Sequence, residues 1–230
     1  MIRVTENLRI IRDLLSKAAA DAGREPGSVT LLAVSKKQPL EAVLEAASAG
    51  QRDFGENFAQ EGIEKMTAAG RGDLVWHFIG HLQSNKTRPV AEHFDWVHTV
   101  DRLKIARRLS EQRPAELEPL KICVQVNLDN ETSKSGVAAA DAIDLAAAVG
   151  ALPRLKLRGF MCIPAPVETP AEQRQAFSRL RAIAALAVDK GLPVDTLSMG
   201  MSDDYVAAVA EGATIVRIGT AVFGPRPGPV

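Results

Sequence analysis

Cysteine and tyrosine are scarce in this chain of 230 residues, which contains two cysteines and one tyrosine. Two cysteines cannot build the dense disulfide scaffold of a small secreted domain, and we interpret Cys123 and Cys162 as buried free thiols in a reducing compartment. A charge excess is also missing, because 28 Lys and Arg residues balance 28 Asp and Glu residues. No global field attracts nucleic acid or an acidic membrane, so a small-molecule ligand is the first expectation.

Long hydrophobic runs are absent as well, and no uncharged run reaches the ~20 apolar residues that a membrane span requires. The N-terminal stretch MIRVTENLRIIRDLLSKAAA mixes charges into an amphipathic pattern, unlike a signal or transit peptide. A metal site is not expected, because the four histidines occur without an HExxH helix or a CxxC pair. We therefore predict a cytoplasmic protein with no membrane, nucleic-acid or metal partner.

What the sequence does contain is an alternation of short apolar runs and amphipathic segments, after a first helix over residues 4–22. Eight runs have strand character: TLLAVS (30–35), RDFG (52–55), VWHFIG (75–80), DWVHTV (95–100), KICVQVNL (121–128), LKLRGFMCI (155–163), DTLSMG (195–200) and ATIVRIG (213–219). Eight strand–helix repeats in 230 residues fit a (β/α)8 barrel better than an open sheet of five or six strands. We predict an α/β fold, a single (β/α)8 TIM barrel with an extra N-terminal helix, spanning residues 1–230 as one domain.

Polar residues follow several of these runs, at the barrel end where the active sites of this fold form. The loops after the seventh and eighth runs, SMGMSD (198–203) and RIGTAVFG (217–224), combine glycine with hydroxyl side chains. Glycine allows close backbone approach and N–H groups at a helix start bind anions, which predicts a phosphate site. The alternative is that Gly200 and Gly219 only make tight turns.

Two lysines directly follow the first run, in LLAVSKKQP (31–39). A lysine at a strand end is usually a solvated cap, but it can also form a Schiff base, for which its amine must be neutral. Partial burial and a neighbouring ammonium both favour the neutral amine. Combined with a phosphate site, such a lysine suggests pyridoxal 5′-phosphate. Strand alternation groups Lys36 with Leu32 and Val34, which favours it over Lys37 for the barrel interior without deciding between them.

Seven motifs, in this order, resemble the pyridoxal phosphate homeostasis proteins, which are similar to the N-terminal barrel of alanine racemase standing alone. They are LLAVSK (31–36), FGENFAQE (54–61), WHFIGHLQSNK (76–86), VNLDNETSKSG (126–136), RGFMCIP (158–164), LSMGMSDDY (197–205) and VRIGTAVFG (216–224). The resemblance implies that the barrel holds pyridoxal 5′-phosphate as an internal aldimine on Lys36. The other cofactor-binding residues that it implies are Asn57, Ser198, Gly200, Ser202, Arg217, Gly219 and Thr220, with Arg217 at the pyridine nitrogen.

The resemblance also implies a protein that buffers or delivers the cofactor and influences amino-acid balance, without catalytic residues of its own. A guanidinium has no acceptor, so Arg217 would leave the pyridine nitrogen unprotonated and the ring a weak electron sink. The racemase takes a tyrosine base from a second domain that is not recognisable here, and Tyr205 is better explained as a helix-surface residue. We expect a monomer whose partners include apo-enzymes that use the cofactor.

Two other functions stay open at this point. One is a pyridoxal phosphate-dependent enzyme of amino acids, such as a weak racemase. The other is a Schiff-base aldolase or sugar-phosphate isomerase that uses the same barrel without this cofactor.

Overall fold

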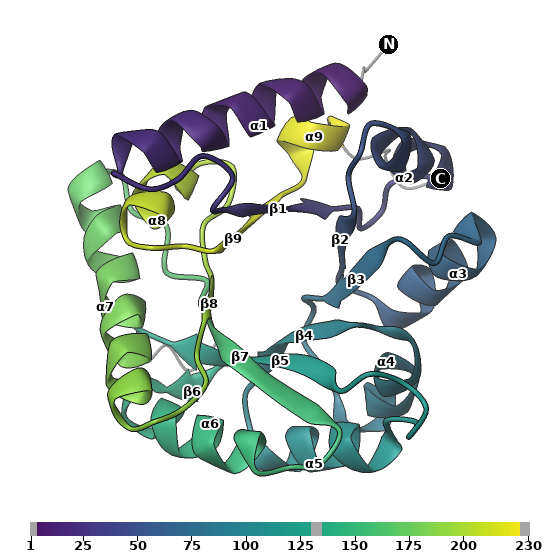
Figure 1. The fold of residues 1–230 in the computed structure, drawn as a ribbon, viewed down its shortest axis with the longest axis vertical. Coiled ribbons are helices and arrows are strands. Elements are labelled where there is room, and N and C mark those ends of the chain that lie inside the picture. Colours follow the sequence, from purple (N-terminus) through teal and green to yellow (C-terminus); the bar gives the residue numbers. More distant parts are fainter. Residues whose placement is uncertain (1–3, 130–134, 226–230) are drawn as a thin grey trace.

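The computed structural model describes residues 4–129 and 135–225 and shows eight parallel strands closed into a barrel inside a ring of helices (Figure 1). The barrel strands are β1 (Thr30–Val34), β2 (Asp53–Glu56), β3 (Val75–Phe78), β4 (Trp96–Val100), β5 (Leu120–Asn127), β7 (Leu155–Met161), β8 (Thr196–Ser198) and β9 (Ile215–Ile218). Strand β1 pairs with β9, and β4 pairs with β5, which closes the ring. The predicted TIM barrel is confirmed, and each predicted run overlaps one of these strands.

The helices cover the outside of the barrel. They are α1 (Val4–Asp21), α2 (Leu40–Ser48), α3 (Ala59–Ala69), α4 (Thr87–His93), α5 (Leu103–Gln112), α6 (Ala142–Gly150), α7 (Pro170–Asp189), α8 (Tyr205–Ala210) and α9 (Thr220–Phe223), with short 3₁₀ turns at Ser84–Lys86 and Ala139–Asp141. Helix α1, the predicted extra helix, packs on α2, α8 and α9 beside the β1–β9 seam (Figure 1). Within the described ranges, no helix has the length and apolar character needed to cross a membrane.

One strand was not predicted. Strand β6 (Val137–Ala138) pairs in parallel with the end of β5, at Val126 and Asn127. It extends the sheet beside the barrel mouth rather than joining the ring. Two residues carry no periodicity, so the sequence pattern could not show this strand.

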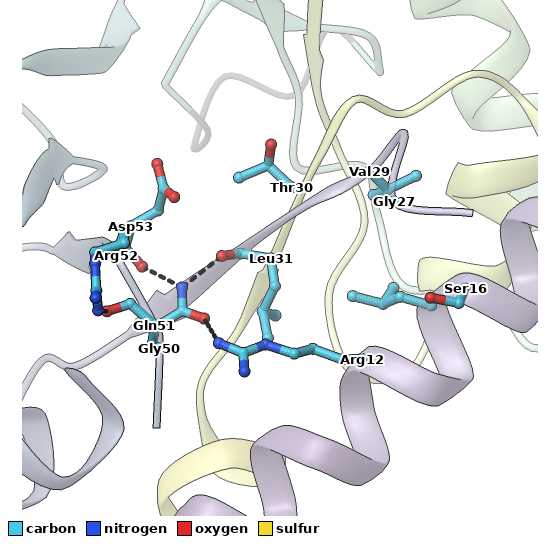
Figure 2. Close-up of a pocket in the computed structure, with 11 residues that line it drawn as sticks. Arg12, Ser16, Gly27, Val29, Thr30, Leu31, Gly50, Gln51, Arg52 and Asp53 are labelled. Carbon is cyan, nitrogen blue, oxygen red and sulfur yellow. Dashed lines mark hydrogen bonds between the residues drawn. The ribbon is translucent and has the colours of Figure 1, made fainter. Parts of the chain in front are cut away.

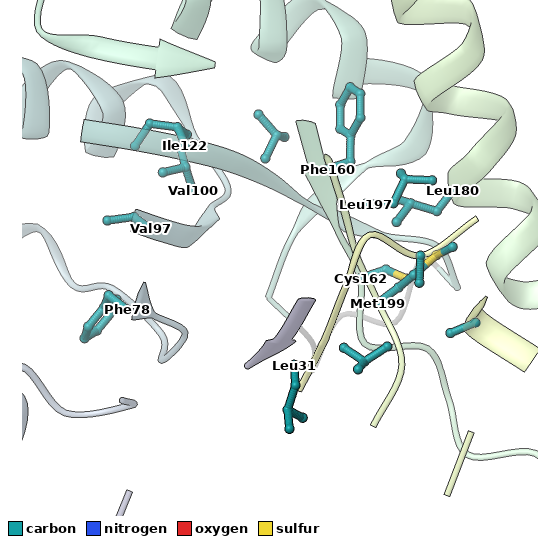
Figure 3. Close-up of a cluster of buried hydrophobic side chains, with 14 of the residues drawn as sticks. Leu31, Phe78, Val97, Val100, Ile122, Phe160, Cys162, Leu180, Leu197 and Met199 are labelled. Atoms are coloured by element: carbon teal, nitrogen blue, oxygen red, sulfur yellow. The ribbon is translucent and has the colours of Figure 1, made fainter. Parts of the chain in front are cut away.

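Alternating strand residues separate two apolar layers. Leu31 and Ala33 belong to the large cluster between the strands and the helices, part of which is drawn in Figure 3. Leu32 belongs instead to a smaller cluster with Trp96 and Met161, whose side chains face the barrel interior. The strand alternation expected for β1 is therefore present, and it continues toward the two lysines that follow the strand.

Strand β7 changes its alternation at Gly159. The register between β5 and β7 shifts after Ile122, because Leu157 pairs with Ile122 whereas Gly159 pairs with Cys123. Gly159 has φ +157, and a Cβ there would lie 1.9 Å from the carbonyl oxygen of Thr196. This bulge explains why Leu157 and Phe160, three residues apart, both contribute to the outer layer.

The two cysteines are free and buried, as expected from the sequence. Burial raises the pKa of both thiols, Cys123 and Cys162, to about 12. We predict that neither reacts with iodoacetamide in the native protein at about pH 8, because the thiolate is the nucleophile. Both should react once urea unfolds the chain, and mass spectrometry counts the added groups. Labelling of either cysteine at the same rate in native and unfolded protein would contradict the burial.

Candidate functional site

The two lysines lie in a turn directly after β1. Lys36 is partly buried, while Lys37 is exposed and has a left-handed backbone with φ 59°. The backbone N–H of Lys37 donates to Glu61 Oε1 on α3, at 2.5 Å. Leu32 faces the interior, so alternation through Val34 places Lys36 on the interior side of the turn. The geometry favours Lys36 as the lysine of the barrel mouth.

A buried ion pair ties this turn to helix α3. The ammonium of Lys65 contacts the carbonyl oxygen of Ser35 at 2.6 Å, Glu56 Oε1 at 2.8 Å and Glu61 Oε1 at 2.7 Å. The Ser35 hydroxyl also donates to Glu56 Oε1, at 2.7 Å. Burial raises the pKa of Glu56, against the lowering effect of Lys65. This cluster holds the residues on both sides of Lys36 in place.

Arg217 lies fully inside the barrel, on β9. Its Nη1 donates to Ser198 Oγ at 2.8 Å, and its Nη2 donates to the carbonyl oxygen of Cys162 at 2.9 Å. Burial lowers the pKa of this guanidinium, although nearby groups including Asp204 oppose the shift. The predicted pyridine-facing arginine is thus a rigidly held cation below the mouth, beside Leu32 of β1.

The two predicted phosphate loops lie together. The backbone N–H of Arg217 donates to the carbonyl oxygen of Gly200 at 3.0 Å, which joins the loop after β8 to strand β9. Gly200 has φ +92, and an added Cβ would lie 2.6 Å from Ala208, so both its backbone and the packing of α8 require glycine. A Cβ on Gly219 would lie 3.2 Å from the carbonyl oxygen of Val34. The loop after β9 therefore borders the end of β1, just before the lysine turn, and the loop after β8 is joined to the same strand β9.

Asn57 lies at the mouth directly after β2, the strand that neighbours β1. It lines a cavity of about 250 Å³ together with Thr99 of β4, Gln125 of β5, and Ile79 and Ile163, which follow β3 and β7. It also lines a cavity of about 630 Å³ beside the mouth, with Phe58 and Lys86. Asn57 Oδ1 is buried with no hydrogen-bond partner in the described ranges. Asn57 is thus a cavity-lining residue with an unsatisfied amide acceptor, of the kind that a bound polar group or water satisfies.

The remaining predicted residues differ in where their side chains lie. The Ser198 hydroxyl bonds to Arg217 and to His98 inside the barrel. Ser202 is half-buried in the loop after β8, and Thr220 is exposed at the start of α9. The structure thus brings the predicted set to one end of the barrel, and the individual phosphate contacts stay predictions.

Several polar residues of the interior were not predicted as part of the site. His77 and His98 were considered only as metal ligands, whereas the structure places them in contact with each other inside the barrel. Among the described residues, no His, Cys, Asp and Glu cluster could hold a metal ion. The available signal was strand alternation: His77 is two residues from Val75 and Ile79, which pack on the interior cluster.

Comparison with known proteins assigns the family. The family model for the N-terminal domain of alanine racemase matches residues 4–227. The chain is 58% identical over 226 residues to the pyridoxal phosphate homeostasis protein of Pseudomonas aeruginosa, covering 98% of this chain and 97% of that protein. This chain belongs to the pyridoxal phosphate homeostasis protein family. The family assignment made from the seven motifs is confirmed.

Solved structures agree with the family assignment. PipY from Synechococcus elongatus, a structure with pyridoxal phosphate bound, has 40% identity and a TM-score of 0.84, covering 96% of this chain and 100% of that chain. Alanine racemase from Corynebacterium glutamicum has 18% identity and a TM-score of 0.73, covering 98% of this chain and 62% of that chain. At that identity the racemase shows a shared barrel fold.

The residues at the mouth of this family member have side chains and backbone groups of the chemical types that pyridoxal 5′-phosphate requires. Lys36 offers an amine for the aldehyde, and the joined loops at Gly200 and Gly219 offer close backbone approach for the phosphate. Arg217 offers a cation, and Asn57 offers an amide whose oxygen lacks a partner in the described ranges. The acidic residues Glu56 and Glu61 are paired with Lys65 on the α3 side.

Proposed function

We propose that this chain binds pyridoxal 5′-phosphate at the barrel mouth, as a Schiff base on Lys36, and buffers or delivers it inside the cell. The observation that supports this proposal most strongly is that three features lie together at one end of the barrel. They are the lysine turn after β1, the joined loops after β8 and β9, and the buried Arg217 below them. Lys36 would supply the neutral amine that condenses with the aldehyde of the ligand, with loss of one water, and because this condensation is reversible the ligand could be released again.

The other residues of the mouth would hold the non-covalent part of the ligand. Gly200, Ser202, Gly219 and Thr220 would hold the phosphate through backbone N–H and hydroxyl groups. Asn57 would contact the ring side of the cavity. Support for this division comes from two contacts: Gly219 lies against Val34, two residues before Lys36, and the carbonyl oxygen of Gly200 accepts from the backbone N–H of Arg217.

We propose a carrier rather than an enzyme. A protonated pyridine nitrogen makes the ring a stronger sink for the electrons of a carbanion, and the donor-only guanidinium of Arg217 does not favour that proton. Tyr205, the one tyrosine of the chain, packs on the outer core at the start of α8. A second acid or base opposite the lysine is therefore not provided by tyrosine. Incubation with pure L-alanine tests this: we expect no sustained change in optical rotation, and continuous racemisation at catalytic protein levels would contradict it.

Cofactor transfer is the direct test of the proposed function. The loaded protein, mixed with an apo-enzyme that requires pyridoxal phosphate, should activate it faster than the same concentration of free cofactor. An equimolar mixture of free cofactor and the unloaded protein is the control for simple release. Activation slower than from free cofactor, with no loss of cofactor from the protein, would reduce the role to storage.

Arg217→Glu should change the absorbance maximum of the bound cofactor and the pH dependence of its visible band. A carboxylate accepts a hydrogen bond and can keep the pyridine nitrogen protonated, whereas the guanidinium cannot. Arg71→Glu, in the loop that precedes β3 at the opposite end of the barrel, makes the same charge change away from the mouth and should leave the spectrum unaltered. An unchanged spectrum and titration in Arg217→Glu would remove Arg217 from the ring contact.

Three further expectations belong to this proposal. Residues 1–230 form one domain, which the closed barrel of the described residues supports. The buried free thiols agree with a cytoplasmic location. The protein acts as a monomer, which light scattering of the loaded and unloaded forms would test.

A further inference from the structure

A chain of hydrogen bonds crosses the barrel interior below Arg217. Ser198 Oγ lies 2.8 Å from His98 Nδ1, His98 Nε2 lies 2.9 Å from His77 Nδ1, and His77 Nε2 lies 3.1 Å from Asp53 Oδ1. With the bond from Arg217 to Ser198, four consecutive hydrogen bonds link β9, β8, β4, β3 and β2. Figure 2 shows the far end, Asp53, at the edge of a cavity by the starts of β1 and β2. The chain thus runs from the mouth to the opposite end of the barrel.

The two ends of this chain fix the position of every proton in it. Arg217 can only donate, so Ser198 Oγ accepts from it and gives its own proton to His98 Nδ1. A neutral His98 then carries its proton on Nε2 and donates to His77 Nδ1. His77 carries its proton on Nε2 in turn and donates to the Asp53 carboxylate, which can only accept. Each of the four hydrogen bonds therefore has one proton, and in each bond the donor is the group nearer to Arg217.

The surroundings keep both histidines neutral. Burial lowers the pKa of His98 well below its ordinary value, and the neighbouring His77 and Arg217 lower it further. Burial also lowers the pKa of His77, although Asp53 and Asp95 oppose the shift and Lys121 adds to it. The His77 ring stacks on Trp96 with centroids 5.3 Å apart and planes 10° apart, which fixes the ring orientation. Rotation of either ring would break two hydrogen bonds in a buried site.

We propose that Ser198, His98, His77 and Asp53 are positioning residues that act through Arg217 and aim its guanidinium at the cofactor ring. This inference rests on the proposed function, because the ring is the target of Arg217. The carbonyl of Cys162 holds one nitrogen of the guanidinium, and the Ser198 end of the chain holds the other. Removal of this hydrogen-bond chain leaves the guanidinium of Arg217 with its bond to the carbonyl oxygen of Cys162. The guanidinium is then free to tilt away from the ring.

The first arm of the test uses the protein without cofactor. Nitrogen-15 NMR of histidine side chains, assigned with His77→Gln and His98→Gln, should show two neutral rings protonated on Nε2 at about pH 7. A charged ring, or a proton on Nδ1 of either residue, would overturn the proton order. This arm does not depend on the cofactor, so it stands even where the proposed function fails.

The second arm measures the loaded protein. In Ser198→Ala the pH midpoint of the cofactor's visible band should rise by about one unit, the order expected when a nearby cation moves away from a titrating nitrogen. The other groups facing Arg217 are Asp204, Cys123 and Cys162, and Ser198→Ala leaves them in place. Ser198→Thr restores the hydroxyl and should restore the midpoint. His98→Leu should shift the midpoint in the same direction, and His98→Gln, with an acceptor and a donor, should shift it less.

The outcomes of the two arms are distinct. An unchanged midpoint in both Ser198→Ala and His98→Leu, with cofactor still bound, would overturn the positioning role. Equal shifts in Ser198→Thr and Ser198→Ala would also overturn it, because they would mark a packing effect rather than a hydrogen bond. Failure of the wild-type protein to form any visible band would instead contradict the proposed function, and the NMR result would still decide the proton order.

Discussion

Lys36→Ala is expected to abolish the visible band of the cofactor-loaded protein and to leave the barrel folded. The change removes Lys36 Nζ, the protein atom of the proposed covalent link. It removes no side chain that belongs to either apolar cluster. The free energy of unfolding without cofactor should therefore stay within about 1 kcal/mol of the wild-type value. Absorbance after incubation with pyridoxal 5′-phosphate measures the first effect, and urea unfolding followed by circular dichroism measures the second.

Lys37→Ala is the matched control, since it removes the neighbouring ammonium from the same turn. Lys37 is exposed, and only its backbone N–H is bonded to Glu61 in the turn, so the band should persist. Loss of the band in Lys37→Ala with retention in Lys36→Ala would show that the strand alternation assigned to β1 does not extend through the turn.

Lys65→Met should be the most destabilising of these substitutions. It leaves Glu56, whose side chain has 0% exposure, with only the Ser35 hydroxyl on Oε1 and no hydrogen-bond partner for Oε2 among the described residues. Loss of one partner from a buried ion pair costs about 3–5 kcal/mol. Urea unfolding at neutral pH measures the loss. Cofactor affinity should fall as well, because Lys65 also holds the carbonyl oxygen of Ser35 next to Lys36.

The stability of Lys65→Met should depend on pH through the carboxyl group of Glu56. Burial raises the pKa of this carboxyl and Lys65 lowers it, so loss of Lys65 raises it further in the folded state. The folded variant then binds more protons than the unfolded chain, and its stability falls as pH rises. The deficit relative to wild type should therefore be smaller at about pH 5.5 than at about pH 8.

A double variant separates the ion pair from simple packing. Lys65→Met with Glu56→Leu removes both charges, and it should recover most of the stability lost in Lys65→Met alone. Equal instability of the single and double variants would show that the ammonium acts through Glu61 and Ser35 rather than through the buried carboxylate.

The fold could be predicted from the sequence because its signal is repeated. Eight apolar runs separated by amphipathic segments left few architectures, and each run was long enough to show its strand character. Strand β6 was missed, since Val137 and Ala138 pair with β5 through backbone bonds that two residues do not encode. The bulge at Gly159 was also not predictable, because the close approach of Thr196 that requires glycine exists only in the closed barrel.

The site was predicted in part, for a different reason. Lys36, Gly200 and Gly219 follow strands whose carboxyl ends meet, and Arg217 lies near that end of β9, so their proximity comes from the barrel itself. Lys65 and Glu56 could not be paired from sequence, because α3 and the turn after β1 meet only through the packing of the helix layer. His77 and His98 looked like isolated strand residues, and their contact depends on the neighbouring registers of β3 and β4.

The site of covalent attachment tests the central claim most directly. The protein loaded with pyridoxal 5′-phosphate is reduced with borohydride, digested, and sequenced by fragment mass spectrometry. We predict that the mass of the reduced cofactor lies on Lys36 in nearly all molecules. A label on Lys37 or Lys65, a label scattered over surface lysines, or no retained label would contradict the account.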